Sequence, residues 1–249
     1  MASNLTTSSD SEIAPVCLVT GGSSGIGLAT AKRFAREGYR VAICGRSKEK
    51  LRAAVDQIQA ASDGNSDFLS LAADLSQPGQ AQQMGQTVLD QFGRIDVLVN
   101  NAGLAPLAAI EDITEAQFES TLNVNLRSVF YLTQLVWRSM AGQGGGVIVN
   151  ISSLAAVDPF PGFSLYGASK AWLDLLTQAL AAEGEPRGIR ICSIRPGAVE
   201  TPLLRGLFPD FPADQCVSPS RIAEVAWGCV HDPQQYPSGQ AFPVTDQPQ

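Results

Sequence analysis

Short apolar runs alternate with longer amphipathic segments along almost the whole chain, and this alternation constrains the fold more than any other feature. The first four runs begin about 25 to 30 residues apart, which leaves room for a crossover helix between parallel strands. Apolar strands joined by helices are typical of a parallel sheet covered on both faces. The pattern therefore predicts one α/β domain, a doubly wound parallel sheet of about seven strands with helices on both faces. The apolar runs are residues 16–19, 41–44, 68–71, 97–99, 147–149 and 189–194.

The segments between these runs have helical character. Residues 26–37 and 51–61 are rich in alanine, leucine, arginine and glutamine, which favour helices. Gly38 stands where a glycine commonly closes a helix. Residues 202–219 differ, because prolines and aromatic residues interrupt them, and they predict a loop-like lid.

Composition narrows the class of protein. Apolar residues make up 45% of the chain and no run of about 18 apolar residues occurs, so we expect a soluble protein without a membrane span. Residues 1–12 have neither a basic start nor an apolar stretch; we interpret them as a disordered polar tail, not a targeting signal, and expect a cytoplasmic protein. The net charge of −7, without a basic stripe, argues against nucleic acid or anionic membrane as a partner.

Cysteine and histidine usage argues against disulfides and metal. The five cysteines form no CxxC pair and their number is odd, so reduced, buried thiols are expected. The only histidine, His231, has no cluster of cysteines or carboxylates at ligand spacing. The sequence thus predicts no metal site.

A glycine-rich run from Thr20 to Gly27 follows the first predicted strand and opens the first helix. Glycines at such a turn let the backbone approach a pyrophosphate, and the helix N-terminus offers free N–H groups to it. The run predicts a Rossmann-type dinucleotide site within one domain spanning residues 13–249. The candidate cofactor contacts in this run are Gly21, Ser23, Ser24, Gly25, Ile26 and Gly27.

The second predicted strand ends at Gly45 and Arg46. A fold that selects NAD usually places a carboxylate at this point for the ribose 2′-hydroxyl. Arginine instead matches a 2′-phosphate with paired, charge-assisted hydrogen bonds. Arg46 therefore predicts NADP(H) over NAD(H), the alternative being an exposed turn arginine.

Tyr166 and Lys170 lie four residues apart, so on a helix they share one face. A free tyrosine titrates near pH 10, about three units above neutrality, and a neighbouring cation lowers that pKa. The pair is typical of a tyrosine that acts as acid or base. Taken alone, it is more often a surface tyrosine beside a solvated lysine.

Taken in order, these motifs resemble the short-chain dehydrogenase/reductase family, in its branch of single-domain enzymes. The resemblance covers residues 16–201 and includes, besides the motifs above, Asn100-Asn101-Ala102-Gly103, Asn125 and Ser153. It implies a carbonyl reductase or alcohol dehydrogenase with Asn125, Ser153, Tyr166 and Lys170 as catalytic residues. The further cofactor contacts that it implies are Asp74, Leu75, Asn101, Ala102, Gly103, Tyr166, Lys170, Pro196, Gly197, Val199 and Thr201.

Two of these assignments have alternatives. Ser153, thirteen residues before Tyr166, has the spacing of the family's serine, and Ser152 points to the other side of its strand as a structural residue. Asp74 is implied to bind the adenine amino group, but it also precedes a helical segment and is compatible with a helix cap.

The predicted substrate pocket is apolar and aromatic, which favours a small hydrophobic ketone or aldehyde, although aromatic residues of a lid also pack on one another. Its residues are Leu104, Ala105, Pro106, Leu154, Val157, Phe160, Phe163, Leu203, Leu204, Phe208 and Phe211. Two alternatives stay open: a 3-oxoacyl-acyl-carrier-protein reductase, which needs a basic docking patch that only Arg187 and Arg138 offer here, and an NADP-binding redox sensor or scaffold without turnover.

The resemblance also implies a homotetramer or homodimer formed through the helices that carry Asn125 and Tyr166. The last predicted strand departs from the family pattern, since Pro243 lacks the N–H that a ladder needs. We therefore expect an edge position for this strand and leave tetramer and dimer open.

Overall fold

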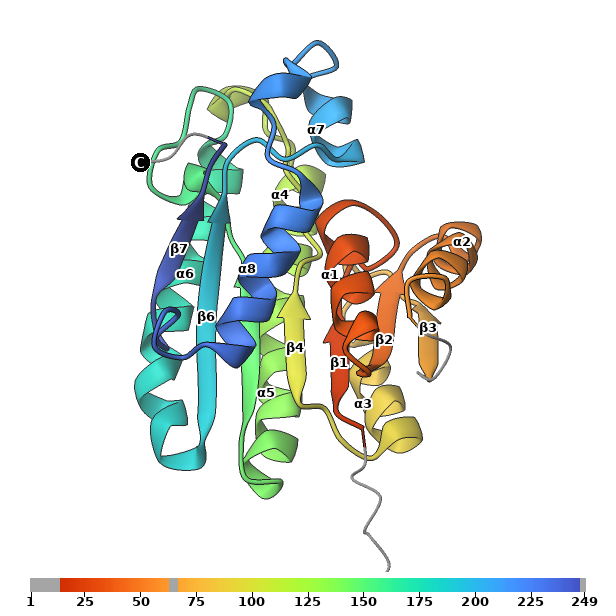
Figure 1. Cartoon of the computed structure of the whole chain (residues 1–249). Helices are drawn as coiled ribbons and strands as arrows, with labels where there is room; N and C mark the ends of the chain where they lie inside the picture. The colour runs from red at the N-terminus through yellow and green to blue at the C-terminus, as the bar shows by residue number, and fades with distance from the viewer. Residues whose placement is uncertain (1–13, 63–66, 247–249) are drawn as a thin grey trace, which may run out of the picture.

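A computed structural model describes residues 14–62 and 67–246; the predicted tail, residues 1–12, lies outside them. The chain forms a seven-stranded sheet in the order β3-β2-β1-β4-β5-β6-β7, and every neighbouring pair is parallel (Figure 1). This confirms the predicted doubly wound fold. The strands are β1 Val16–Val19, β2 Arg40–Gly45, β3 Phe68–Ala72, β4 Val97–Asn100, β5 Gly146–Ile151, β6 Ile189–Pro196 and β7 Ala241–Val244.

The two helices predicted in the first half are confirmed within three residues. The second begins early, at Lys48, because the Ser47 side chain accepts a hydrogen bond from the Lys50 N–H and caps it. Gly38 has a φ of 80° just beyond the end of the first, as a closing glycine should. The helices are α1 Gly25–Arg36, α2 Lys48–Gln59, α3 Gln80–Phe92, α4 Glu115–Leu122, α5 Ser128–Gly142, α6 Ser164–Gly184, α7 Pro202–Leu207 and α8 Pro219–His231.

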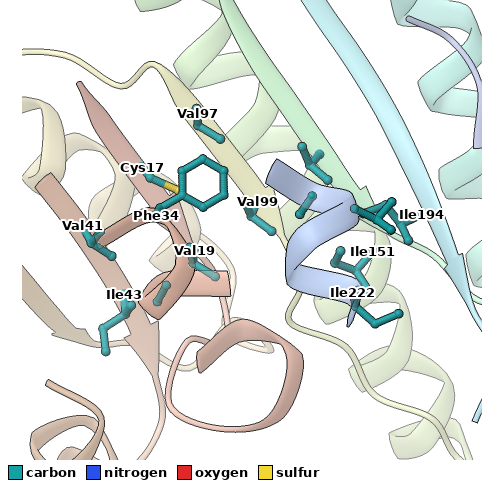
Figure 2. Packing of buried hydrophobic residues seen from close by; sticks show 14 of the residues in the cluster. Cys17, Val19, Phe34, Val41, Ile43, Val97, Val99, Ile151, Ile194 and Ile222 are labelled. Atoms are coloured by element: carbon teal, nitrogen blue, oxygen red, sulfur yellow. The ribbon is translucent and has the colours of Figure 1, made fainter. Parts of the chain in front are cut away.

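The sheet separates two hydrophobic cores. Helices α1, α2 and α8 pack on one face and α3, α5 and α6 on the other, so that α1 and α8 lie in front of the sheet in Figure 1. Figure 2 shows the front core, where Phe34 of α1 lies against Cys17 and Ile222 of α8 against Ile151. Burial on both faces explains why the inner strands, such as β1 and β4, are continuous apolar runs, whereas the edge strands β3 and β7 are only partly buried.

Residues 202–219 are not the continuous loop that was predicted. Pro202 is the first residue of α7, and the Thr201 side chain caps this helix by accepting from the Leu204 N–H at 3.2 Å. A short 3₁₀ turn, Ala213–Gln215, follows, and α8 begins at Pro219. Proline at the first helical position has no N–H to lose, so a proline-punctuated segment can still be helical. The role of this segment as a lid stays a prediction.

The order of the strands fixes where a ligand can bind. β1 and β4 are neighbours, and the chain winds from β1 toward β3 on one side and from β4 toward β7 on the other. In open α/β sheets ligands bind outside the carboxyl ends of the strands at this switch point. The same sheet places β7 at an edge, with Pro243 opposite Arg195, which confirms the position expected for that proline.

Residues 14–62 and 67–246 contain neither a candidate membrane span nor a candidate metal cluster. No helix there is both long and apolar enough to cross a membrane. No cluster of histidine, cysteine or acidic residues in these ranges fits a metal ion. All five cysteines are free; four are buried as predicted, whereas Cys216 is partly exposed.

Candidate active site

The glycine-rich turn after β1 is held against the start of α1. A methyl group on Gly27 would lie 2.4 Å from the Gly21 carbonyl oxygen, so only glycine lets helix and turn approach this closely. The Asn101 side chain fixes the turn by donating to the carbonyl oxygens of Thr20 and Gly21 at 2.8 and 3.2 Å. The Thr20 hydroxyl accepts from the backbone N–H groups of Asn101 and Ala102. This bracing joins β1 to β4 at the switch point.

The start of α1 fits a pyrophosphate. Ser24 occupies the N-cap position, and its hydroxyl makes no capping hydrogen bond to the helix in the described chain, which leaves the first N–H groups available. Gly21 has a φ of 65°, which favours glycine, and a glycine leaves the backbone of the turn open to a ligand. The cradle thus matches the anion that the sequence predicts, by geometry and by the helix dipole.

A cleft of about 760 Å³ extends from this cradle to the end of the sheet under α7. It brings together all the predicted cofactor residues except Gly27, which lies behind the turn. The predicted cofactor residues that line the cleft are Gly21, Ser23, Ser24, Gly25, Ile26, Arg46, Asp74, Leu75, Asn101, Ala102, Gly103, Tyr166, Lys170, Pro196, Gly197, Val199 and Thr201.

Arg46 and Asp74 lie at the adenine end expected for a dinucleotide. Arg46 is exposed and follows β2 directly, so its guanidinium can reach a group on the ribose. Asp74 accepts from the Ser76 backbone N–H at 3.0 Å and from the Ser76 hydroxyl at 2.8 Å. These bonds orient the carboxylate without capping α3, whose N-cap is Gly79, so the alternative of a helix cap is wrong.

Ser153 and Tyr166 meet in the middle of the cleft. Ser153 follows β5, and its hydroxyl oxygen accepts from the Ala155 N–H at 3.1 Å, which fixes its rotamer. A hydrogen bond with Ser153 lowers the pKa of Tyr166, but burial raises it more, and the net shift is upward. Tyr166 therefore carries its proton at neutral pH in the unliganded protein.

Lys170 lies beneath the tyrosine. Its ammonium donates to the Ile151 carbonyl oxygen at 2.7 Å and stands 5.7 Å from the centre of the Tyr166 ring. Burial lowers the pKa of Lys170 to about 8, while the charge of Asp174 raises it. The surface-pair alternative is thereby excluded, because the lysine is buried and its side chain is directed at the strand.

Ser152, the residue before Ser153, also borders the cleft, but its hydroxyl is engaged by the backbone of α6. Its hydroxyl donates to the Lys170 carbonyl oxygen at 3.2 Å and is buried. It ties β5 to the helix that carries the tyrosine.

Asn125 lies in a π-helical turn, Asn123–Arg127, between α4 and α5. Its side chain accepts from the Leu104 N–H and donates to the Leu104 carbonyl oxygen, and it donates to the Ser169 hydroxyl at 2.9 Å. It therefore connects the segment after β4 to α6, next to Lys170, although it does not itself line the cleft. Such turns are frequent at functional sites.

A partly buried ion pair lies one helical turn beyond Lys170 and was not predicted from the sequence. The Asp174 carboxylate accepts from the Ser193 hydroxyl at 2.5 Å and from Arg195 Nε at 2.7 Å. Asp174 is only 8% exposed. One signal was available, since Asp174 follows Lys170 by one helical turn, but its partners on β6 are about 20 residues away and nothing in the sequence links them.

We expect Asp174→Asn to move the alkaline limit of turnover to lower pH. Asp174 raises the pKa of Lys170, so its removal, with Arg195 left unpaired, lowers that pKa below about 8. As the pH rises, Lys170 then loses its proton at a lower pH than in the wild-type protein. Neutral Lys170 no longer stabilises the phenolate of Tyr166. The measurement is kcat/KM against pH. Asp174→Glu, which keeps the charge, is the control, and an unchanged or higher limit in Asp174→Asn would contradict the assignment.

The far end of the cleft is aromatic. The Phe160 and Phe163 rings lie 4.3 Å apart between centroids, and Phe208 of the segment after α7 contacts both at about 6 Å. Phe163 also packs edge-on against Tyr166 at 5.1 Å. These rings form one wall that joins the predicted lid to Tyr166.

The predicted pocket residues line this end with two exceptions. Pro106 is not part of the lining, and Val157 points outward and is 59% exposed. The prediction placed them by their position in the chain, which does not determine the direction of a side chain in a loop. The predicted residues that do line the cleft are Leu104, Ala105, Leu154, Phe160, Phe163, Leu203, Leu204, Phe208 and Phe211; those missed include Ser76, Asp158, Ala198 and Leu207.

Comparisons with known proteins show the family to which the chain belongs. A family model described as short chain dehydrogenase matches residues 15–211. The 3-oxoacyl-acyl-carrier-protein reductase of Thermotoga maritima is 34% identical over 237 residues, 92% of this chain and 95% of that protein.

Two solved structures are similar over nearly the whole chain. A 3-ketoacyl-acyl-carrier-protein reductase from Brucella melitensis, complexed with NADH, has a TM-score of 0.82 and 32% identity, covering 93% of this chain and 96% of that chain. A blue fluorescent protein from a metagenomic library, in complex with NADPH, has a TM-score of 0.83 and 30% identity with the same coverage. The chain therefore belongs to the short-chain dehydrogenase/reductase family of oxidoreductases, whose members bind nicotinamide cofactors.

Proposed function

We propose that the protein reduces a small hydrophobic ketone or aldehyde with NADPH. The observation that carries this proposal is the convergence of Ser153, Tyr166 and Lys170 in one cleft, between the phosphate cradle at one end and the aromatic wall at the other. Three polar groups beside a wall of aromatic rings suit a substrate whose carbonyl is joined to an apolar portion.

Each catalytic side chain has a defined task in this reaction. Ser153 donates a hydrogen bond to the carbonyl oxygen and so stabilises the negative charge that develops there. When bound, the reduced nicotinamide supplies a hydride to the carbonyl carbon. Tyr166 gives its phenolic proton to the oxygen, which completes the alcohol. Lys170 stabilises the phenolate that remains, and its position next to Asn125 suits a route by which the proton is replaced.

Arg46 supports NADPH as the cofactor. Its exposed guanidinium lies at the end of β2 in the cleft, where no carboxylate follows the strand to repel a phosphate. Cys44 and Gly45 precede it on β2 and carry no charge.

The test is turnover. Purified protein is incubated with NADPH or NADH and a panel of aryl, cyclic and aliphatic ketones and aldehydes, and consumption of the reduced cofactor is followed by absorbance. We expect turnover of apolar carbonyls and a kcat/KM at least about tenfold higher with NADPH. Tight NADPH binding without turnover of any carbonyl would favour a redox sensor or scaffold instead.

A second candidate is reduction of 3-oxoacyl groups on an acyl carrier protein, the activity after which two of the proteins compared above are named. Its weakness is electrostatic, since an acidic carrier needs a basic surface and this chain has a net charge of −7. Including a 3-oxoacyl thioester on a carrier protein, and the same acyl chain on a simple thiol, in the panel separates the two candidates.

We also propose that the protein forms a homodimer or homotetramer in the cytoplasm. Helices α4, α5 and α6 expose large apolar side chains, among them Phe118, Phe130 and Leu175, the last at 65%. A second copy of the chain is a suitable cover for such a surface. Free, buried thiols fit a reducing compartment.

A further inference from the structure

The charged residues that line the cleft are unevenly distributed. Arg46 and Asp74 belong to the adenine end, and Lys170 lies under Tyr166. The substrate end has a single ionisable side chain among the described residues, the exposed carboxylate of Asp158. No ion pair engages Asp158 within the described chain. The free charge beside the substrate is therefore negative.

The one nearby cation of the lid is already occupied. Arg205 of α7 binds both carboxylate oxygens of Glu200, with Nε at 2.8 Å from one of them. Its Nη1 also donates to the carbonyl oxygens of Pro209 and Phe211, at 3.1 and 2.5 Å. These four contacts neutralise the charge of the guanidinium and occupy its donors. Arg205 therefore holds the segment that carries Phe208 and is not available to bind an anionic substrate.

The aromatic wall adds to the preference for a cation. Phe160 is separated from Asp158 by a single proline and is 46% exposed. Its ring extends the wall formed with Phe163 and Phe208. The face of a phenyl ring attracts an ammonium group and offers nothing to a carboxylate. Ring faces and one carboxylate at the same end of a cleft form a suitable environment for a protonated amine.

We propose that the substrate end selects carbonyl compounds by charge and favours an aryl ketone that carries an ammonium group, with Asp158 as the specificity-determining residue. The chemistry of the carbonyl rests on the function proposed above, but the charge preference is a property of binding. It excludes thioesters of phosphorylated carriers and ketones with a free carboxylate as good substrates, because neither finds a free cation.

The test uses three acetophenones of similar shape: 4-(aminomethyl)acetophenone, 4-ethylacetophenone and 4-acetylbenzoate. Their Kd values for the enzyme saturated with NADP⁺ are measured by calorimetry at low ionic strength, and kcat/KM is measured with NADPH. We expect the ammonium ketone to bind about fivefold more tightly than the neutral one, as for an exposed charge pair, and the carboxylate ketone more weakly than either. Added salt should reduce the difference.

In Asp158→Asn, the ratio of the Kd of the ammonium ketone to the Kd of the neutral ketone should be close to one. Asp90→Asn, an exposed aspartate on α3 that does not line the cleft, is the matched control and should keep the wild-type ratio. Equal binding of the carboxylate ketone, or a ratio that Asp158→Asn leaves unchanged, overturns the inference. If the order of Kd values holds but none of the three ketones is reduced, the charge preference stands and the proposed carbonyl reduction fails.

Discussion

Tyr166→Phe should lower kcat for carbonyl reduction by about 10² to 10⁴, the contribution usual for a positioned general acid. The substitution removes only the hydroxyl, so the ring keeps its edge-on contact with Phe163, and the cleft keeps its shape. The Kd for NADPH should change by less than about twofold, because binding relies on the glycine turn and Arg46 at a distance from the phenol. Single-turnover kinetics together with a fluorescence titration of NADPH measure both quantities.

Tyr131→Phe is the matched control for this experiment. Tyr131 lies on α5, packs against Phe130 and is not part of the cleft, so its loss of a hydroxyl should leave kcat at the wild-type level. A Tyr166→Phe enzyme with near wild-type turnover would refute the role of the phenol. A matching fall in both variants would point to a general loss of folded protein.

Arg46→Ala should lower kcat/KM with NADPH by about tenfold to a hundredfold and leave kcat/KM with NADH nearly unchanged. The expected size is that of one or two charge-assisted hydrogen bonds to a 2′-phosphate, at about 1.5 to 3 kcal/mol each, reduced by solvent because Arg46 is exposed. The loss should appear in KM, since Arg46 is far from the reacting carbonyl.

Arg52→Ala on α2 is the control for charge alone. Arg52 is exposed and close in sequence to Arg46, but it does not line the cleft. If its removal lowers the NADPH preference as much as Arg46→Ala does, a diffuse positive field and not a direct contact selects the cofactor. If the Arg46→Ala enzyme kept its full preference for NADPH over NADH, Arg46 would not be the residue that binds the 2′-phosphate.

The sheet and most of the residues lining the site were predictable because they follow from local pattern. Strands buried on both faces must be apolar along their whole length, so β1 coincides with the run from Val16 to Val19, and β2, β4, β5 and β6 contain theirs. The glycine turn and the residues after β4 likewise belong to fixed positions at strand ends. The cleft lies at the carboxyl edge of the sheet, where the topology requires it.

What sequence could not provide depends on contacts between distant segments. Asp174 and Arg195 meet because α6 packs on β6, and no spacing rule relates them. The helix α7 had a local signal, a threonine followed by proline at the start, but the density of prolines in the segment outweighed it in the prediction. The direction of a loop side chain, as at Val157, is decided by its neighbours in space.

The π-helical turn at Asn123–Arg127 places α4 and α5 out of phase by one residue. A helical sequence pattern that is continuous through this region would therefore assign the wrong face to every residue on one side of the turn. For anyone who redesigns this protein, α4 and α5 are two separate amphipathic units whose relative rotation is set by one extra residue. Shortening the turn by a residue would rotate Asn125 by about 100° and detach it from Leu104.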